Sequence, residues 1–356
     1  MNLCCPNCFS DEYLKSYLKE NGHRGTCDFC CKNSAYCIDP EELADLFLPV
    51  IHLYSIVEDF MPTEELKEYD GEFIWEKLNN DWEIFNLDYK EQEELLRSMF
   101  PGDRKEGPPQ FLESYVEREN EYWGTDDDIA DELKKRWEDF CNEIKYENRF
   151  FIKKQVDLYN LGDLLSYLSI SLDNELLYRA RNNTRKAIHQ FKPQRMGKPS
   201  AKQSQHGRAN PKGIPYLYLA SDAETAIAEI RPGIHDRITV GKFKIINSLK
   251  VIDLRNPGID SPFKHGHELE YIIQHAAFLR KLGSEISKPI NPEDPELEYL
   301  PLQYLCEFIK HKGFAGVIYK SSVSKGYNVA VFNDNKVRCI STKLYELDFS
   351  PRPAKK

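Results

Sequence analysis

The chain has 356 residues, of which 41% are hydrophobic and 30% are charged. This composition is ordinary for a globular protein, and the length suffices for two domains or three small ones. The sequence has no apolar run of about 18 residues and does not start like a secretory signal. We therefore expect a cytoplasmic protein without a membrane-spanning segment.

The net charge of -10 conceals two halves of opposite sign. Residues 1–170 contain 39 acidic and 18 basic side chains, whereas residues 171–356 contain 19 acidic and 30 basic ones. Within residues 179–212 there are ten Lys or Arg and no Asp or Glu. Because electrostatic potential is local, this acidic protein can still bind an anion through its basic half. The alternative is a solvated loop that the acidic half covers.

Seven of the ten cysteines lie within the first 37 residues. Cys5 and Cys8 form one CxxC pair, and Cys27 and Cys30 form another, with 18 residues between the pairs. Two such pairs supply four thiolates to one tetrahedral zinc ion, and four thiolates leave no open position for catalysis. We predict a structural zinc ribbon over residues 1–40, and unligated thiols are the alternative. The other cysteines near enough to compete as ligands are Cys4, Cys31 and Cys37.

Residues 41–170 show the spacing of apolar residues that is typical of helices. A helix is predicted over residues 41–60, with Asp39 as its N-cap and Pro40 in its first turn. The same spacing recurs at residues 90–100, 109–123, 126–146 and 158–168. This pattern predicts an acidic helical domain. Its tryptophans recur among apolar neighbours and are predicted to be core residues: Trp75, Trp82, Trp123 and Trp137.

Residues 171–356 show short strand-like runs between loops, together with a few helices, which predicts an α+β domain. The predicted strands are residues 216–219, 238–246, 249–254, 316–319, 328–332 and 336–340. The predicted helices are residues 222–230, 266–282 and 301–312.

The most unusual local pattern lies just before the first predicted strand. Glycines and prolines within residues 207–215 predict a turn that projects Arg208 and Asn210. A guanidinium group at such a turn suits a phosphate, because it makes paired, charge-assisted hydrogen bonds. Tyr218 follows on the strand.

A carboxylate follows on the next helix. Glu229 lies eleven residues after Tyr218, on a helix face that is otherwise apolar. It either pairs with Arg231 or points into a site. Tyr218 could equally be a core aromatic residue, and Ser321 could cap a strand end. Taken singly, each residue therefore has a structural interpretation as well as a functional one.

Together, these residues resemble the RES domain, a family named for its Arg, Glu and Ser. The resemblance rests on residues 207–232, on Tyr178-Arg179 before them, and on residues 313–321 and 326–332 after them. It covers residues 171–345. The acidic half with its cysteine-rich start resembles the HEPN-type N-terminal domain that accompanies some RES proteins. The resemblance implies a zinc ribbon and a helical domain, followed at residues 171–356 by a mixed α/β RES domain similar to ADP-ribosyltransferases.

The resemblance also implies an activity and a partner. RES proteins are similar to toxins of toxin–antitoxin pairs that destroy NAD, so NAD would be the substrate and an antitoxin protein a partner. By motif, Arg208, Glu229 and Ser321 match the residues that name the family. Tyr218 matches its strand tyrosine, and Arg179 matches a further arginine.

The motif leaves two positions open. Ser322 stands beside Ser321 and could be the matching serine instead. Ala209 occupies a position where many family members carry Trp, so one wall of the pocket differs in this chain.

Cleavage of the bond between nicotinamide and ribose fits these residue types. Nicotinamide leaves as a neutral ring, so the reaction needs mainly stabilisation of an oxocarbenium-like transition state. Glu229 would stabilise the ribosyl cation and orient water, and Tyr218 would stack on the nicotinamide. Arg179 and Arg208 would bind the pyrophosphate, and Ser321 would hold the ribose or the carboxamide. Water as acceptor gives a glycohydrolase, phosphate gives a phosphorylase, and a side chain or nucleic acid gives a transferase.

The sequence also allows one other class of function and disfavours several. A zinc ribbon beside a basic loop is a common arrangement for binding nucleic acid without turnover, and the helical domain could be a sensor or form a homodimer. The sequence lacks a P-loop, a GxGxxG and an HExxH motif, which disfavours NTPases, Rossmann dehydrogenases and zinc proteases. Ribonuclease activity of the HEPN type is not expected, because the helical half offers only His52, without an arginine just upstream.

Overall fold

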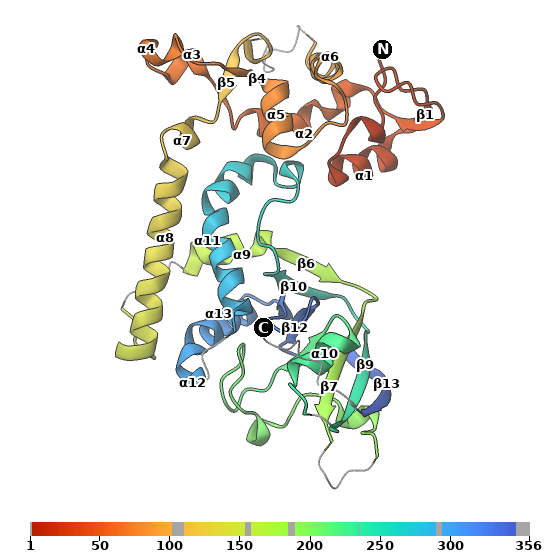
Figure 1. The fold of residues 1–356 in the computed structure, drawn as a ribbon, viewed down its shortest axis with the longest axis vertical. Helices are drawn as coiled ribbons and strands as arrows, with labels where there is room; N and C mark the ends of the chain where they lie inside the picture. The colour runs from red at the N-terminus through yellow and green to blue at the C-terminus, as the bar shows by residue number, and fades with distance from the viewer. Residues whose placement is uncertain are drawn as a thin grey trace. The chain divides into compact units, whose positions relative to one another are not determined.

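The computed structural model describes residues 2–101, 110–153, 158–183, 189–233, 235–289 and 294–346. It contains two compact units (Figure 1): Met1–Ala130 with Ile259–His275, and Asp131–Gly258 with Ala276–Lys356. The division falls inside two helices, α8 (Thr125–Asn142) and α11 (Leu269–Ser287). Within the described ranges, no helix has the length and apolar character needed to cross a membrane.

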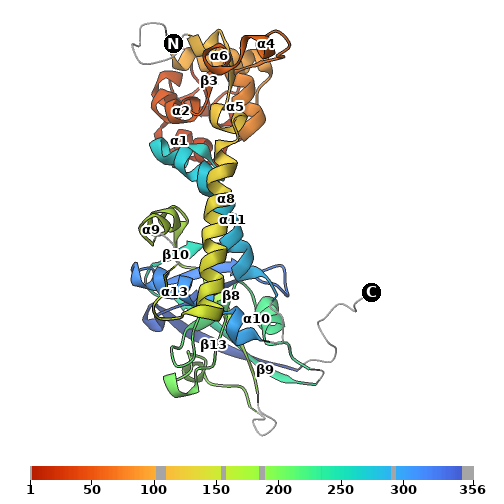
Figure 2. The ribbon, with the colours of Figure 1, turned by 90° about the vertical axis from the view of Figure 1, so that its left-hand side faces the viewer.

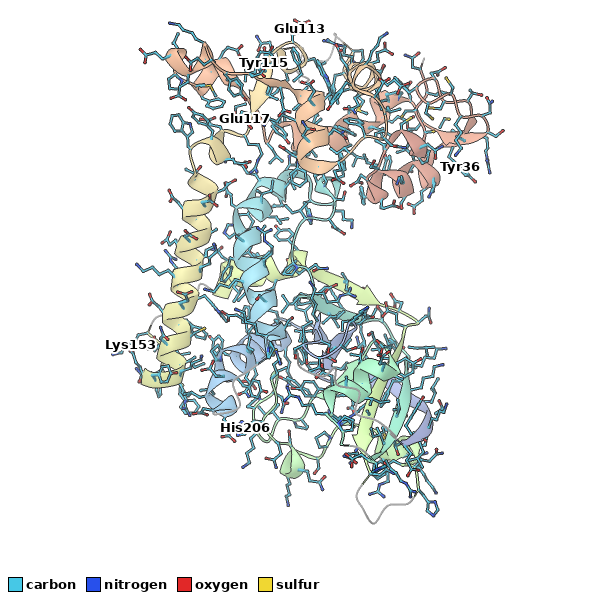
Figure 3. All side chains as sticks on the ribbon, in the orientation of Figure 1. Tyr36, Glu113, Tyr115, Glu117, Lys153 and His206 are labelled. Atoms are coloured by element: carbon cyan, nitrogen blue, oxygen red, sulfur yellow. The ribbon has the colours of Figure 1, made fainter. Side chains whose placement is uncertain are left out.

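The first unit is mainly helical. Its helices besides parts of α8 and α11 are α1 (Glu12–Asn21), α2 (Ala44–Ile51), α3 (Val57–Phe60), α4 (Thr63–Leu66), α5 (Ile74–Trp82), α6 (Tyr89–Met99) and α7 (Glu119–Tyr122). Its strands are β1 (His23–Gly25), β2 (Ala35–Cys37), β3 (Ser55–Ile56), β4 (Glu72–Phe73) and β5 (Tyr115–Glu117). β1 pairs with β2, and β5 lies between β3 and β4 in a second small antiparallel sheet. Figure 3 shows Tyr115 and Glu117 on this middle strand.

One hydrophobic core joins the cysteine-rich segment to the helices that follow it. Phe9 contacts Phe47 of α2 and Phe85, with ring centroids 6.4 and 6.0 Å away. The ring centroid of Phe47 also lies 4.7 Å from that of Phe263, which belongs to the second segment of this unit, Ile259–His275. Residues 1–40 therefore share their apolar packing with helices beyond residue 41.

Local signals in the sequence explain where several of these helices begin. Asp88 and Glu91 form a capping box at the start of α6, where each side chain accepts a hydrogen bond from the other residue's backbone N–H. Asp39 accepts from the backbone N–H of Glu41, as predicted for an N-cap. The predictions for residues 90–100, 126–146 and 158–168 are confirmed by α6, α8 and α9 (Leu158–Tyr167).

Three predictions for this half were wrong. The helix expected over residues 41–60 ends at Ile51, because strand β3 begins at Ser55 and pairs with β5. The segment 109–123, which was expected to be a helix, contains strand β5 instead, because pairing with β3 and β4 overrides the local helical spacing. Trp123 is 54% exposed, so it is not a core residue. Trp75 and Trp137 are buried as expected, and Trp82 is partly buried and donates to Tyr54.

The second unit is built on an eight-stranded sheet in the order β13-β9-β7-β8-β12-β11-β10-β6. Its strands are β6 (Ser169–Leu172), β7 (Leu176–Asn182), β8 (Leu217–Ala220), β9 (Arg237–Ile245), β10 (Leu249–Asp253), β11 (Gly316–Lys320), β12 (Tyr327–Val331) and β13 (Val337–Glu346). Its helices besides α9 and parts of α8 and α11 are α10 (Ala223–Glu229), α12 (Pro295–Glu298) and α13 (Leu300–His311). Only β10 and β11 run parallel among these strands, and β9 and β13 form a long antiparallel pair at one edge (Figure 2).

The two faces of this sheet bury different side chains. Large aliphatic residues such as Leu219, Ile318 and Val329 form a core on one face. On the other face, α10 covers small residues including Ala180 and Ala220. Small side chains under a short helix leave room for a cavity beside it.

The strands and helices predicted from the sequence in this half are confirmed, with boundary shifts of a few residues. The predictions missed β6 and β7, as well as α12. The last predicted strand, residues 336–340, is longer than expected because β13 continues to Glu346 beside β9. The chain is mixed helix and sheet, as predicted.

Candidate active site

A cavity of about 570 Å³ is lined by β7, β8, β11, β12 and α10. The sheet register aligns its floor: Tyr178 pairs with Ala220, Ala220 with Asn328, and Asn328 with Tyr319. Neighbours across antiparallel strands point to the same face. Four strands therefore place one continuous row of side chains beneath the cavity, and the volume is typical of a small-molecule site.

The turn that carries Arg208 is held by buried amides. Asn210 is 3% exposed, and its Nδ2 lies within hydrogen-bond distance of Ser204 Oγ and of the carbonyl oxygens of Gln205, Pro211 and Ile214, at 2.9–3.3 Å. Its Oδ1 accepts from the Tyr218 hydroxyl at 2.7 Å. The prediction that this turn projects Asn210 was wrong, because the amide satisfies backbone carbonyls inside the turn.

Three more contacts fasten the same turn. Gln303 of α13, 4% exposed, donates to the carbonyls of Gly207 and Asn210 at 2.9 and 3.1 Å. The Tyr218 oxygen accepts from the backbone N–H of Ala209 at 3.1 Å. A Cβ on Gly207 would overlap both Asn210 Oδ1 and the Tyr218 hydroxyl. This overlap explains why a glycine precedes Arg208. Burial of the Tyr218 hydroxyl raises its pKa well above the usual value for tyrosine.

Arg208 lies at the rim of the cavity and also reaches α11. Its Nη1 donates to the carbonyl oxygens of Ile286 and Lys288, at 2.5 and 2.6 Å. These are among the last carbonyls of the helix, which a cation stabilises. No carboxylate of the described residues forms an ion pair with Arg208. Its charge is therefore available to an anion.

Glu229 is the last residue of α10, and its carboxylate faces the cavity. Its Oε1 accepts from Asn328 Nδ2 at 2.6 Å and from Ser321 Oγ at 2.7 Å. Among the residues that the structure describes, Glu229 has no ion pair with Arg231 or any other cation. A carboxylate at a helix C-terminus is unfavourable on electrostatic grounds, so its place here points to a functional role.

Ser321 holds Glu229 and does not line the cavity. Its hydroxyl donates to Glu229 and accepts from the backbone N–H groups of Val323 and Ser324, at 3.2 and 3.1 Å. One donor and two acceptors are all that a hydroxyl offers. Ser322, the neighbouring residue, is the serine that lines the cavity.

Arg179 borders the cavity from β7, but its guanidinium points elsewhere. Its Nη1 donates to the carbonyls of Met196 and Gly197. Because Tyr178 and Ala180 face the cavity side, the pleat directs Arg179 to the opposite face of the sheet. Burial, and after it Arg181, lowers the pKa of Arg179 to about 10, so the side chain stays charged at neutral pH.

Several residues that line the cavity were not predicted as site residues. Asn328 orients Glu229, and Tyr299 and Tyr319 add aromatic surface. Burial raises the pKa of Tyr319, and nearby Arg208 counteracts this rise. Arg231 also lines the cavity and has a φ of +46°, in the left-handed region that disfavours residues other than glycine. Asn328 follows Gly326-Tyr327 in the family motif, which was the one available signal.

The basic stretch at residues 179–212 is only partly a free cationic surface. Lys198 pairs with Asp334 at 3.0 Å, while Arg181 and Arg195 lie over the ring of Phe191. His206, on the loop near α12 (Figure 3), has its Nε2 3.5 Å from Glu296 Oε1. Arg185 and Lys186 lie outside the described residues.

The predicted zinc ligands lie together in the first unit. The ligand atoms of Cys5, Cys8, Cys27 and Cys30 are all within 4.8 Å of one another. The sulfurs of Cys5 and Cys30 are 3.4 Å apart, and those of Cys8 and Cys27 are 3.3 Å apart. Zn–S bonds of about 2.3 Å place sulfurs nearly 4 Å apart in a tetrahedral site, so the cluster is compatible with zinc. The other three cysteines of the segment stand outside it: Cys4, Cys31 and Cys37.

Two protein-family models match this chain. The RES domain model matches residues 176–350, which include the cavity, and the HEPN/RES N-terminal domain 1 model matches residues 20–157. The second unit is thus a mixed α/β domain in which Arg208, Glu229 and Ser322 line one cavity. The chain belongs to the RES domain family and carries a HEPN/RES N-terminal domain ahead of the RES domain.

Among the solved structures that match this chain is the crystal structure of the M.tuberculosis MbcT-MbcA toxin-antitoxin complex. The match has 14% sequence identity and a TM-score of 0.32, and it covers 52% of this chain and 91% of the other. No curated protein matches the chain.

Proposed function

We propose that this protein is an enzyme that consumes NAD by cleaving the bond between nicotinamide and ribose. Membership of the RES domain family supports the proposal. The observation that carries it is the Glu229 carboxylate, which faces a cavity of about 570 Å³, is oriented by Asn328 and Ser321, and has no ion pair with a cation of the described chain.

The carboxylate would act by charge. Both hydrogen bonds that Glu229 accepts from described residues go to Oε1, so Oε2 is free to face the substrate. Positive charge develops on the ribose as nicotinamide departs, and a preoriented carboxylate stabilises it. The same oxygen can align a water molecule for attack on the ribosyl carbon, which gives a glycohydrolase.

Aromatic and cationic residues would hold the rest of the substrate. The rings of Tyr178, Tyr218 and Tyr319 line the cavity and offer faces on which nicotinamide can stack. Arg208 and Arg231 line it as well and would bind the pyrophosphate. Ser321 acts through Glu229, so Ser322 is the serine within reach of a ribose hydroxyl or the carboxamide. Arg179, predicted to bind pyrophosphate too, would contribute only after leaving the carbonyls that it contacts here.

Acceptor and biological setting are part of the same proposal. Phosphate in place of water would make the enzyme a phosphorylase, and a protein or nucleic-acid acceptor would make it a transferase. The family resemblance favours a toxin that an antitoxin protein restrains. The four-cysteine cluster would hold a structural zinc ion that orders the start of the chain. Nucleic-acid binding and homodimer formation stay predictions.

Release of nicotinamide from NAD by the purified full chain tests the proposal. Glu229→Gln keeps the shape and the hydrogen bonds of the side chain but removes its charge. We expect it to lower kcat by about a thousandfold, as for loss of a main electrostatic group, with a small effect on KM. Chromatography of the co-product distinguishes ADP-ribose from its 1-phosphate. Full turnover by the variant would refute the assigned role, and no turnover by wild type with water, phosphate or nucleic acid as acceptor would refute the function.

A further inference from the structure

A second cavity, of about 500 Å³, lies in the same unit and shares no lining residue with the first. Its walls come from the last turns of α11, the loop after β10 and the end of β11. Among the described residues that line it, none is acidic. The basic residues that line it are Arg255, Arg280, Lys288 and Lys320.

The loop after β10 comes close to α11 because the helix carries a glycine there. A Cβ on Gly283 would lie 2.6 Å from the Leu254 oxygen and 2.8 Å from Pro257 Cγ. Both distances are shorter than real contacts of a Cβ, so any larger residue would push the loop away from the helix. Gly283 therefore sets the shape of the cavity between the loop and the helix.

Three of the four cations have no counter-charge among the described residues. Arg255 is neutralised by Asp253, with Nη2 and Oδ2 2.5 Å apart, and its guanidinium lies 4.5 Å from the ring centre of Tyr327. Arg280, Lys288 and Lys320 have no carboxylate partner among the residues that the structure describes. Like charges that face one small space repel each other unless an anion joins them.

A polar atom without a partner adds to this chemistry. The Ser287 hydroxyl is buried and finds no hydrogen-bond partner within the described chain. It lines the same cavity as Ser284. A buried hydroxyl left unsatisfied is costly, and a ligand with acceptor oxygens would satisfy it.

The cavity is linked to the candidate active site through Arg208. That guanidinium donates to the carbonyls of Ile286 and Lys288, which flank Ser287. Lys288 thus directs its carbonyl to Arg208 while its side chain lines the second cavity. Movement at this end of α11 would therefore move the Arg208 guanidinium, which lines the first cavity.

We propose that the second cavity binds a phosphoryl group through Arg280, Lys288, Lys320 and the Ser287 hydroxyl. The binding does not depend on turnover, but its connection to catalysis through Arg208 rests on the proposed function. Two sources share this chemistry. One is a free phosphate compound, and the other is the 2′-phosphate of a dinucleotide, which would make the cavity a determinant of preference for NADP over NAD.

Calorimetric titration of the full chain with inorganic phosphate, pyrophosphate, NAD and NADP tests the proposal. Arg280→Gln/Lys288→Gln should weaken the binding of phosphate compounds by about tenfold or more, as expected when charge-assisted hydrogen bonds are lost. The control Lys202→Gln/Lys212→Gln removes the same charge from exposed residues that line neither cavity and should bind like wild type. Arg280→Lys/Lys288→Arg keeps the charge and should retain most of the affinity.

These titrations distinguish a free phosphate compound from the 2′-phosphate of a dinucleotide. They also distinguish phosphoryl binding in the second cavity from NAD cleavage in the first. Binding of phosphate or pyrophosphate that the Gln pair abolishes supports a free compound, and an effect confined to NADP supports the dinucleotide. Glu229→Gln should still bind in either case, so a failure of NAD cleavage does not affect this test. Absence of binding by phosphate, pyrophosphate and NADP, or equal binding by the Gln pair while its circular dichroism stays native, would overturn the proposal.

Discussion

Two loops in this protein are held by opposite means. The segment between Cys27 and Cys37 is largely exposed and is joined to the chain start by clustered sulfurs, with only a few backbone hydrogen bonds around them. The turn at residues 204–214 is held by buried amides, chiefly Asn210 and Gln303. In the proposed function a zinc ion completes the first arrangement, whereas the second is held by hydrogen bonds between described residues of the chain itself. We therefore expect loss of metal to affect folding, and loss of an amide to affect the candidate active site.

The largest expected effect is that of removing the metal. Purified protein should contain one zinc ion per chain, and Cys8→Ser should lose it. Zinc binding contributes on the order of 10 kcal/mol in small zinc domains, so the first unit should unfold at a lower temperature in this variant or in a chelator. Metal analysis and differential scanning calorimetry measure both effects. Cys31→Ser is the control, since Cys31 is exposed and outside the cluster, and loss of zinc from it would show a different ligand set.

Replacing the central amide of the other loop should have the next largest effect. Asn210→Leu leaves the Tyr218 hydroxyl and several backbone carbonyls without their partner, which costs about 2–4 kcal/mol for groups of this kind. Because the turn carries Arg208, NAD cleavage should fall as well. Urea unfolding and nicotinamide release measure the two effects. Gln205→Leu, at an exposed position in the same turn, should change neither by much. An unaltered Asn210→Leu variant would show that the turn is held by other contacts.

The two adjacent serines provide a finer test of the cavity. Ser321→Ala removes a hydrogen bond that orients the Glu229 carboxylate, so kcat should fall by about tenfold with little change in KM. Ser322→Ala should raise KM instead, since this residue lines the cavity. Steady-state kinetics separates the two variants, because the first should change kcat and the second KM. The reverse pattern would make Ser322 the positioning residue.

The smallest expected effect concerns backbone strain beside Glu229. Arg231→Gly places the residue with the fewest restrictions at a φ of +46°, so the protein should gain up to about 1 kcal/mol of stability. The same change removes a cation from the cavity, so KM for NAD should rise. Arg231→Asn, which tolerates the same backbone region and also removes the charge, should give a smaller gain in stability and a similar KM. A loss of stability in the glycine variant would contradict the strain argument.

Much of the fold could be predicted because its elements carry strong local patterns. The capping residues around α6 and the apolar spacing of α11 and α13 identify helices without reference to anything distant. Predictions failed where a long-range pairing overrode the local pattern, as in β5, which lies in a region of helical spacing but pairs with β3 and β4. Short strands of two or three residues have too little periodicity to be recognised.

The candidate site was predicted in part for the same reason. Motif order was enough to select Arg208, Tyr218 and Glu229, and the structure brings all three to one cavity. Asn328 was missed because its position after Gly326-Tyr327 in the family motif was the one signal that marked it, and that signal assigns no role to the amide. Its importance comes from a contact with a residue 99 positions away in the chain.

The sequence by itself determined the cysteine pairs, the order of most strands and helices, and the family to which the chain is similar, because these depend on spacing along the chain. Only the tertiary structure decided where side chains point. In the structure the Asn210 amide points into its own loop, and the Arg179 guanidinium lies on the far face of the sheet. The Ser321 hydroxyl donates to Glu229, whereas Ser322 lines the cavity. The physical reason is that the direction of a side chain follows from strand register and from hydrogen-bond partners far away in sequence, which local patterns do not encode.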